Sequence, residues 1–93
     1  MRYPIIGAFL LGISLAAPAS ANEALAKKSG CLTCHAVDAK KVGPSFKSTA
    51  AKYRGKEGMA EKLTAELSDE KVHPTNKATP AERKTLVEWV LAM

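Results

Sequence analysis

The sequence predicts a small all-α domain, and three observations support that prediction. Apolar residues recur at helical spacing in four short segments that follow residue 22. No segment alternates apolar and polar residues with the β-branched enrichment that is typical of strands. Glycine or a capping motif bounds most of the helical segments. We therefore expect about four short helices, with two longer loops at 36–45 and 69–78 that each contain a proline.

The first 21 residues have the layout of a secretory signal peptide. Arg2 supplies the positive charge, an apolar run covers 5–17, and the small residues of Ala19-Ser20-Ala21 precede the expected cleavage point. The apolar run is shorter than the roughly 20 residues that cross a bilayer, although an uncleaved anchor helix remains the alternative. We expect residues 1–21 to be a cleaved signal peptide, and residues 22–93 to be one periplasmic domain without stable membrane insertion.

Three short helices are predicted ahead of the C-terminal helix, and they cover 23–29, 46–54 and 59–68. Glycine follows the first two, as is common at helix ends. The second and third carry apolar residues at intervals of three or four, which places each set on one face. These residues are Phe46, Ala50 and Tyr53, then Met59, Leu63 and Leu67.

The C-terminal helix has the clearest start signal in the chain. Thr79-Pro80-Ala81-Glu82 matches a capping box, with Thr79 as the N-cap, Pro80 in the first helical position and Glu82 reaching back. One apolar stripe follows this start, formed by Leu86, Trp89, Val90 and Met93.

The mature chain is too short to be a multidomain enzyme or a repeat array. Chains of this size bury little surface and often need a metal, a disulfide or another staple. Only Phe46, Tyr53 and Trp89 remain as aromatic residues after cleavage, and the two cysteines are too close in sequence to cross-link a long loop. We therefore expect something other than side chains to fill the centre of the domain.

The distribution of charge limits the kinds of molecule that this chain is expected to bind. The formal net charge of the chain is +5, but its lysines and arginines are scattered rather than clustered. Nucleic-acid binding usually requires a clustered basic footprint, so this pattern argues against it. A mildly positive face is suited to steering encounters with an acidic partner protein, and it is equally compatible with lysines that only keep the chain soluble.

The motif that is most indicative of function is Cys31-Leu32-Thr33-Cys34-His35. Two thiols three positions apart, with an adjacent imidazole, suit covalent attachment of haem and ligation of its iron. A thioredoxin-like pair would need strands around it, and a local disulfide would leave the core unfilled. A zinc site formed by Cys31, Cys34, His35 and His73 has enough ligands, but its spacing matches no common zinc finger. An exported chain that lacks other core material favours haem.

Four stretches of the sequence together resemble a known family. They are Ser29–Asp38, Lys41–Phe46, Ala50–Gly55 and Thr85–Leu91. In this order they are similar to the class I c-type cytochromes, in particular the small bacterial periplasmic cytochromes c that donate electrons to nitrite reductase. The resemblance covers nearly all of 23–93, and it implies a small cytochrome c fold around one covalently attached haem c.

The resemblance implies a role for each residue of the haem motif. Cys31 and Cys34 would form the thioether links, and His35 would be the proximal iron ligand. Pro44 would offer its backbone carbonyl to the outer N–H of the His35 ring, a bond that fixes the tautomer and increases the basicity of the ligand. Gly43 would allow the backbone to approach that ring closely.

The resemblance also implies that the first helix crosses the last one. Leu25 would then pack on the apolar stripe of the C-terminal helix, while Ala26 occupies a position where relatives often have an aromatic residue. The loop before His73 is shorter than in those relatives and lacks their tryptophan. Arg54 and Lys56 are therefore the candidates left to pair with the haem propionates.

The sixth iron ligand is where this sequence departs from the family. Relatives have methionine followed by proline, then asparagine two residues later, whereas this chain reads His73-Pro74-Thr75-Asn76. The interval from His73 to Trp89 equals the family interval from that methionine to tryptophan. We expect His35 and His73 to be the two iron ligands, with Met59 or an open position as alternatives.

A haem with two axial side chains predicts an electron carrier and not an enzyme, because no open site or acid–base pair remains. Imidazole favours ferric iron more than a thioether does, so we expect a lower potential than in His/Met relatives. Redox proteins with an acidic docking face are the expected partners. The alternative function is a ligand-binding or sensor haem protein in which His73 is displaced.

Overall fold

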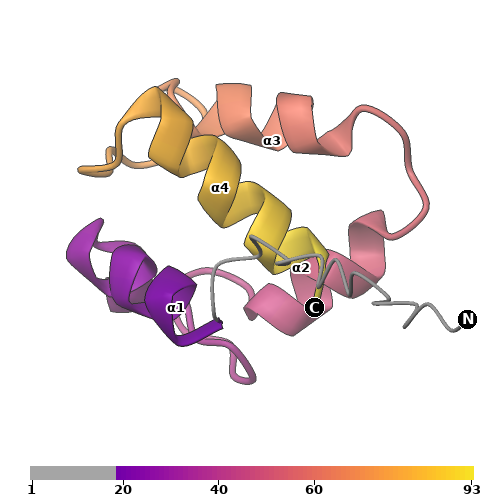
Figure 1. Ribbon diagram of the computed structural model, residues 1–93, viewed down its shortest axis with the longest axis horizontal. Coiled ribbons are helices and arrows are strands. Elements are labelled where there is room, and N and C mark those ends of the chain that lie inside the picture. The colour runs from indigo at the N-terminus through magenta and orange to yellow at the C-terminus, as the bar shows by residue number, and fades with distance from the viewer. Residues whose placement is uncertain (1–18) are drawn as a thin grey trace, which may run out of the picture.

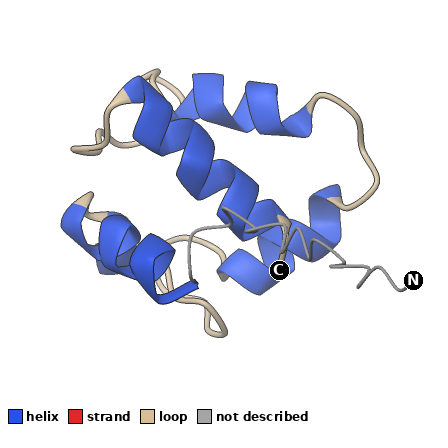
Figure 2. Ribbon diagram, viewed as in Figure 1, coloured by secondary structure: helices blue, strands red, loops and turns tan. Residues whose placement is uncertain are grey.

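The computed structural model describes residues 19–93, with side chains from residue 21 onward. It contains four α-helices and one short 3₁₀ helix: α1 (Ala19–Lys28), η1 (Cys31–Thr33), α2 (Phe46–Tyr53), α3 (Met59–Leu67) and α4 (Pro80–Leu91). Helices and loops make up the whole of the described chain, in which no strand occurs (Figure 2). The all-α prediction is therefore confirmed.

Helix α4 lies at the centre of the arrangement. It runs diagonally across the molecule, with α3 on one side and α1 and α2 on the other (Figure 1). All three of these helices contact α4. The segment between α1 and α2 and the segment between α3 and α4 form the two long loops of the domain. Because α1, α2 and α3 all pack on α4, the capping motif that sets the start of α4 also helps to determine where the other helices lie.

The helix boundaries agree with the sequence-based predictions to within one or two residues, except at the start of α1. That helix begins at Ala19, so it extends across the expected cleavage point after Ala21. Most of the predicted signal peptide lies outside the described residues, and cleavage stays a prediction. None of the helices within 19–93 combines the length and apolar content needed to traverse a bilayer.

The predicted capping box is present at the start of α4. The Thr79 hydroxyl accepts a hydrogen bond from the Glu82 backbone N–H at 3.2 Å, and the Glu82 carboxylate accepts one from the Thr79 N–H at 2.9 Å. That second bond lowers the pKa of Glu82. At the end of α1, Gly30 has a φ of +89°, a conformation that favours glycine.

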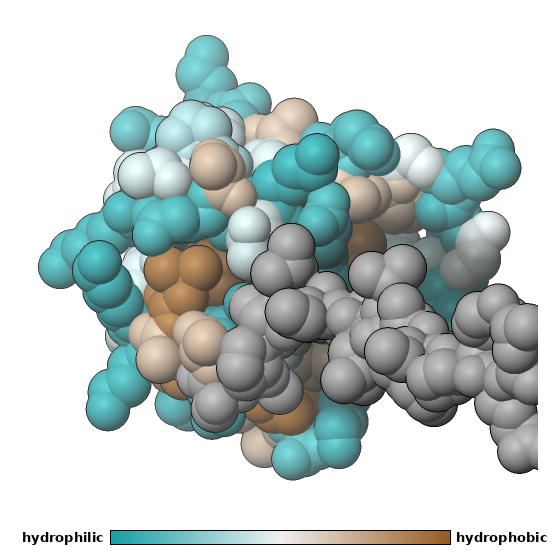
Figure 3. Space-filling model, viewed as in Figure 1, coloured by the Kyte–Doolittle hydropathy of each residue, from teal (hydrophilic) through white to brown (hydrophobic). Residues whose placement is uncertain are grey.

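The protein core is thin and consists mainly of small side chains. The buried apolar residues are Ala26, Phe46, Ala50, Ala78, Leu86 and Val87. Ala26 of α1 is buried in one cluster with Leu86 of α4, and Leu25 is partly buried against the same cluster, as the resemblance implied. On the face shown in Figure 3, hydrophobic residues gather where α1 meets α4. No large side chain in the described part of the chain is fully buried, as expected for a domain that packs around a cofactor.

Candidate functional site

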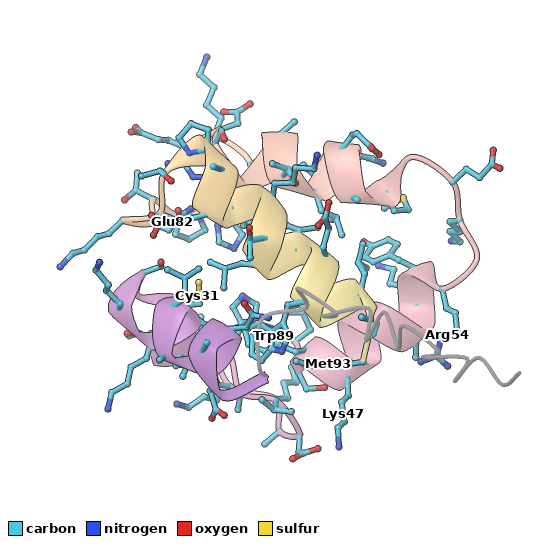
Figure 4. The ribbon with its side chains drawn as sticks, viewed as in Figure 1. Cys31, Lys47, Arg54, Glu82, Trp89 and Met93 are labelled. Carbon is cyan, nitrogen blue, oxygen red and sulfur yellow. The ribbon has the colours of Figure 1, made fainter. Side chains whose placement is uncertain are left out.

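The haem motif lies on a tight turn that directs three side chains into one cavity. Gly30 ends α1, and η1 then brings the backbone N–H groups of Cys34 and His35 to the Cys31 carbonyl oxygen, at 3.2 and 3.0 Å. Cys31 lies between α1 and α4 (Figure 4). Both thiols are half-buried and unpaired, so they form no disulfide with each other. Burial raises the pKa of the Cys31 thiol, an effect that a hydrogen bond from its own backbone partly opposes.

The loop after the motif fixes the orientation of the His35 ring. Nδ1 of His35 lies 2.7 Å from the Pro44 carbonyl oxygen, which is the contact expected from the sequence. The Gly43 backbone passes so close that a Cβ added there would lie 2.3 Å from Cε1 of the ring. The Gly43 N–H also donates to the Cys34 carbonyl oxygen at 2.7 Å. Only glycine fits this position, because any side chain would displace the imidazole.

Aromatic packing also supports the same imidazole. The Phe46 ring stacks on His35 with a centroid separation of 5.3 Å, and Trp89 meets Phe46 edge-on at 5.7 Å. Phe46 is buried at the start of α2, while Trp89 comes from α4 and lies between the two helices (Figure 4). The His35 ring therefore has a backbone hydrogen bond, a glycine and an aromatic neighbour to hold it in place.

His73 faces the same cavity from the second loop. Its ring is parallel to that of His35, with an interplanar angle of 5° and a centroid separation of 6.1 Å. Nδ1 of His73 lies 2.8 Å from the Pro74 carbonyl oxygen. In both histidines, therefore, Nδ1 faces a backbone carbonyl, which favours the tautomer that leaves Nε2 with a free lone pair. The second of these carbonyl contacts was not predicted from the sequence.

The two histidines line one cavity of about 410 Å³, whose remaining walls are largely apolar. Cys31, Cys34 and Pro44 contribute to the lining as well. The residues present therefore suit a large, flat, apolar group that offers positions for two thioether bonds and two nitrogen ligands. A zinc centre does not fit, since the described part of the chain contains no cluster of three or more metal-ligating side chains.

Several cavity residues were not predicted, and several predicted candidates lie elsewhere. Glu66 of α3 and Val87 of α4 line the cavity, although neither belongs to the apolar faces read from the sequence. Met59 is absent from the cavity lining. Arg54 is absent too, and its guanidinium donates to the Met93 carbonyl oxygen at 3.0 Å. Lys56 lies over the Tyr53 ring instead.

The sequence profile of the family described as cytochrome c matches residues 19–93. The chain belongs to the cytochrome c family. One relative is cytochrome c-551 of Azotobacter vinelandii, which is 46% identical over 77 residues, or 75% of this chain and 94% of the relative. Cytochrome c-551 of Stutzerimonas stutzeri is 39% identical over 103 residues, with 100% of this chain and 99% of the relative covered.

Solved structures agree with this assignment. The class 1 cytochrome MtoD from Sideroxydans lithotrophicus ES-1 is similar to this cytochrome with a TM-score of 0.67 and 39% identity, over 78% of this chain and 92% of that one. The N64Del mutant of Nitrosomonas europaea cytochrome c552 gives the same TM-score at 34% identity, over 75% and 96% of the two chains. The protein is thus a small class I cytochrome c that carries one covalently attached haem c, and it is an electron carrier rather than an enzyme.

Proposed function

We propose that this cytochrome is a periplasmic one-electron carrier whose haem is attached at Cys31 and Cys34 and whose iron is ligated by His35 and His73. The observation that carries the proposal is the pair of parallel imidazoles on one cavity, 6.1 Å apart between centroids. Because both rings line the same cavity, His35 and His73 could each ligate the iron of a haem held there.

The chain's own residues prepare both imidazoles for this role. The Pro44 and Pro74 carbonyls hold the two Nδ1 atoms, so that Nε2 of each ring is free to bind iron. When bound, the haem supplies the reversible one-electron change between ferric and ferrous iron. Phe46 and Gly43 keep the His35 ring from rotating, and the apolar walls limit the access of water to the site.

Two histidine ligands imply a lower midpoint potential than a His/Met pair. Imidazole stabilises ferric iron relative to ferrous iron, whereas a thioether does the reverse. The absorption spectrum of the oxidised protein tests the ligand assignment directly. We expect a low-spin spectrum without the methionine–iron charge-transfer band in the far red, and the presence of that band would contradict the assignment.

A substitution of the sixth ligand provides an independent test. We expect His73→Met to raise the midpoint potential and to introduce the missing charge-transfer band. The matched control is Met59→Leu, which alters the methionine that does not line the cavity and should leave the potential unchanged. An unchanged potential in His73→Met would mean that His73 does not bind the iron.

The redox partners are proposed to be proteins with an acidic docking face. The formal net charge of +5 supports this. Val42 lies at the rim of the haem cavity and is 84% exposed, and Lys40 and Lys41 precede it on the same loop. An apolar contact next to lysines suits a transient complex whose association weakens as salt rises.

A further inference from the structure

The loop that carries His73 is held by polar contacts rather than by burial. Val72 is 60% exposed, while Pro74 and Thr75 lie on the wall of the haem cavity. The buried anchor of this segment is Ala78, at its far end. A loop with so little apolar contact opens locally at low free-energy cost unless hydrogen bonds hold it. The contacts that tie down its two ends therefore determine how firmly His73 stays in the cavity.

Asn76 forms one of these contacts, near the C-terminal end of the loop. Its Nδ2 donates to the Leu67 carbonyl oxygen at 2.9 Å, which ties the loop to the last turn of α3. Its Oδ1 accepts from the Ala78 N–H at 3.2 Å. The side-chain amide is partly buried, so loss of its partners would leave polar atoms unsatisfied.

Arg83 joins both ends of the loop from helix α4. Its Nε donates to Asn76 Oδ1 at 3.0 Å, and its Nη1 donates to the Ser68 hydroxyl oxygen at 3.1 Å. Ser68 in turn donates to the Thr64 carbonyl oxygen at 3.3 Å. Ser68 directly precedes the loop and Asn76 lies near its end, so one guanidinium fixes the span that contains His73. We call Ser68, Asn76 and Arg83 the loop clasp.

We propose that Arg83 is a positioning residue for the sixth iron ligand, and that the loop clasp sets how readily His73 leaves the iron. This inference rests on the proposed ligation by His73. The planar guanidinium has donors that reach two acceptors at once, which a lysine ammonium on a flexible stem does not reproduce. Loss of the clasp frees both ends of an exposed loop, and the cavity then becomes accessible to a small external ligand.

The test uses the holoprotein and the rate at which carbon monoxide binds to its ferrous form. His73 must leave before carbon monoxide binds, so the observed rate follows the population of the open loop. We expect Arg83→Met to increase this rate about tenfold or more, because two hydrogen bonds are lost. Lys84→Met is the matched control on the next residue, since Lys84 is exposed and makes only an i,i+4 pair with Glu88. It should react as the wild type does.

Ser68→Ala and Arg83→Lys each retain part of the clasp and should give smaller increases, and they carry the test if Arg83→Met does not mature. Hydrogen exchange of the backbone amides of 70–75 supplies a second readout, with faster exchange expected in Arg83→Met. Rates and exchange equal to those of the wild type in all clasp variants would overturn the proposal.

His73→Ala separates failure of the clasp from failure of the ligand assignment. If His73→Ala binds carbon monoxide rapidly while the clasp variants behave as wild type, the clasp proposal is wrong and the ligand assignment stands. If His73→Ala binds it no faster than the wild type, the proposed ligation fails, and the clasp proposal fails with it.

Discussion

The two loops that present histidines to the cavity are held in different ways. The loop at 36–45 and the first residue of α2 hold the His35 ring through contacts close in sequence: Gly43, Pro44 and Phe46 all lie within eleven residues of it. Residues 69–78 hold the His73 ring with one contact to the adjacent proline. The loop itself is held by hydrogen bonds from other parts of the fold: Arg83 donates to Asn76, Asn76 donates to the Leu67 carbonyl oxygen, and the Lys77 N–H donates to the Ser29 carbonyl oxygen. The loop next to His35 is therefore held rigid by steric contacts between residues close in sequence. The loop that carries His73 is held rigid only by hydrogen bonds to distant residues.

This difference suits a ligand pair in which one histidine follows the attachment motif directly and the other does not. His35 is adjacent to Cys34, so a covalent attachment there would keep it near the iron at all times. His73 has no such neighbour and is brought into the cavity by the packing of α3 against α4. We expect any displacement of a ligand to occur on the His73 side.

The largest effect is expected on the His35 side, from Gly43→Ala. The added Cβ would lie 2.3 Å from the imidazole, so the ring or the backbone must move. Overpacking of this kind typically costs about 1–3 kcal/mol, and we expect a sharp drop in folded, haem-loaded protein and in its unfolding temperature. Pro44→Ala is the matched control, because it keeps the carbonyl that accepts from His35. Equal stability of the Gly43→Ala variant and the wild type would show that the loop adapts.

A moderate effect is expected on the cavity wall next to the His73 loop, from Glu66→Gln. Apart from histidine, Glu66 is the only charged side chain among the described residues that line the cavity. Its carboxylate stabilises the more positive ferric state, so its removal should raise the midpoint potential by roughly a few tens of millivolts. Glu61→Gln on the exposed face of α3 is the control. Voltammetry in which both variants match the wild type would argue against a contribution from Glu66.

The smallest effect on stability is expected at the capping box of α4, which follows the His73 loop, from Glu82→Gln. The Thr79 N–H lowers the pKa of Glu82, so ionised Glu82 stabilises the folded state above its unfolded pKa, and this contribution disappears as pH falls through the folded pKa. We expect Glu82→Gln to reduce stability slightly at neutral pH and to narrow the difference from the wild type in acid. Thermal unfolding at several pH values measures it. A difference that widens on acidification would contradict this account.

Features encoded by neighbouring residues could be predicted from the sequence. The capping box at Thr79 and Glu82, the start of α2 at Phe46 and the contact of His35 with Pro44 are all present. The two helix starts depend on residues a few positions apart, so their spacing determines their geometry, whereas the contact of His35 with Pro44 was implied by the resemblance to the family. The start of α1 was placed too late, because the expected cleavage point was used as a boundary although a helix can run through it.

Features that depend on distant residues were missed. From the sequence, Arg83 is one of many expected surface cations, yet its guanidinium donates hydrogen bonds to Ser68 and Asn76. Glu66 reads as part of a solvated helix face, although it lines the cavity. Arg54 was a candidate to pair with the haem propionates, but its guanidinium donates a hydrogen bond to the Met93 carbonyl oxygen. No periodicity or motif marks such contacts, because they arise only when α2 and α3 pack on α4.

The sequence by itself determined the helices and the attachment motif, since these follow from local propensity and short-range spacing, and its resemblance to the family implied the close approach of the backbone to the His35 ring. Only the tertiary structure decided that the His35 and His73 rings lie parallel on one cavity, that a carboxylate shares its wall, and that a guanidinium from α4 fixes the second loop. The physical reason is that an exposed loop has no strong conformational preference of its own, so its shape is set by the partners that the packed helices bring to it.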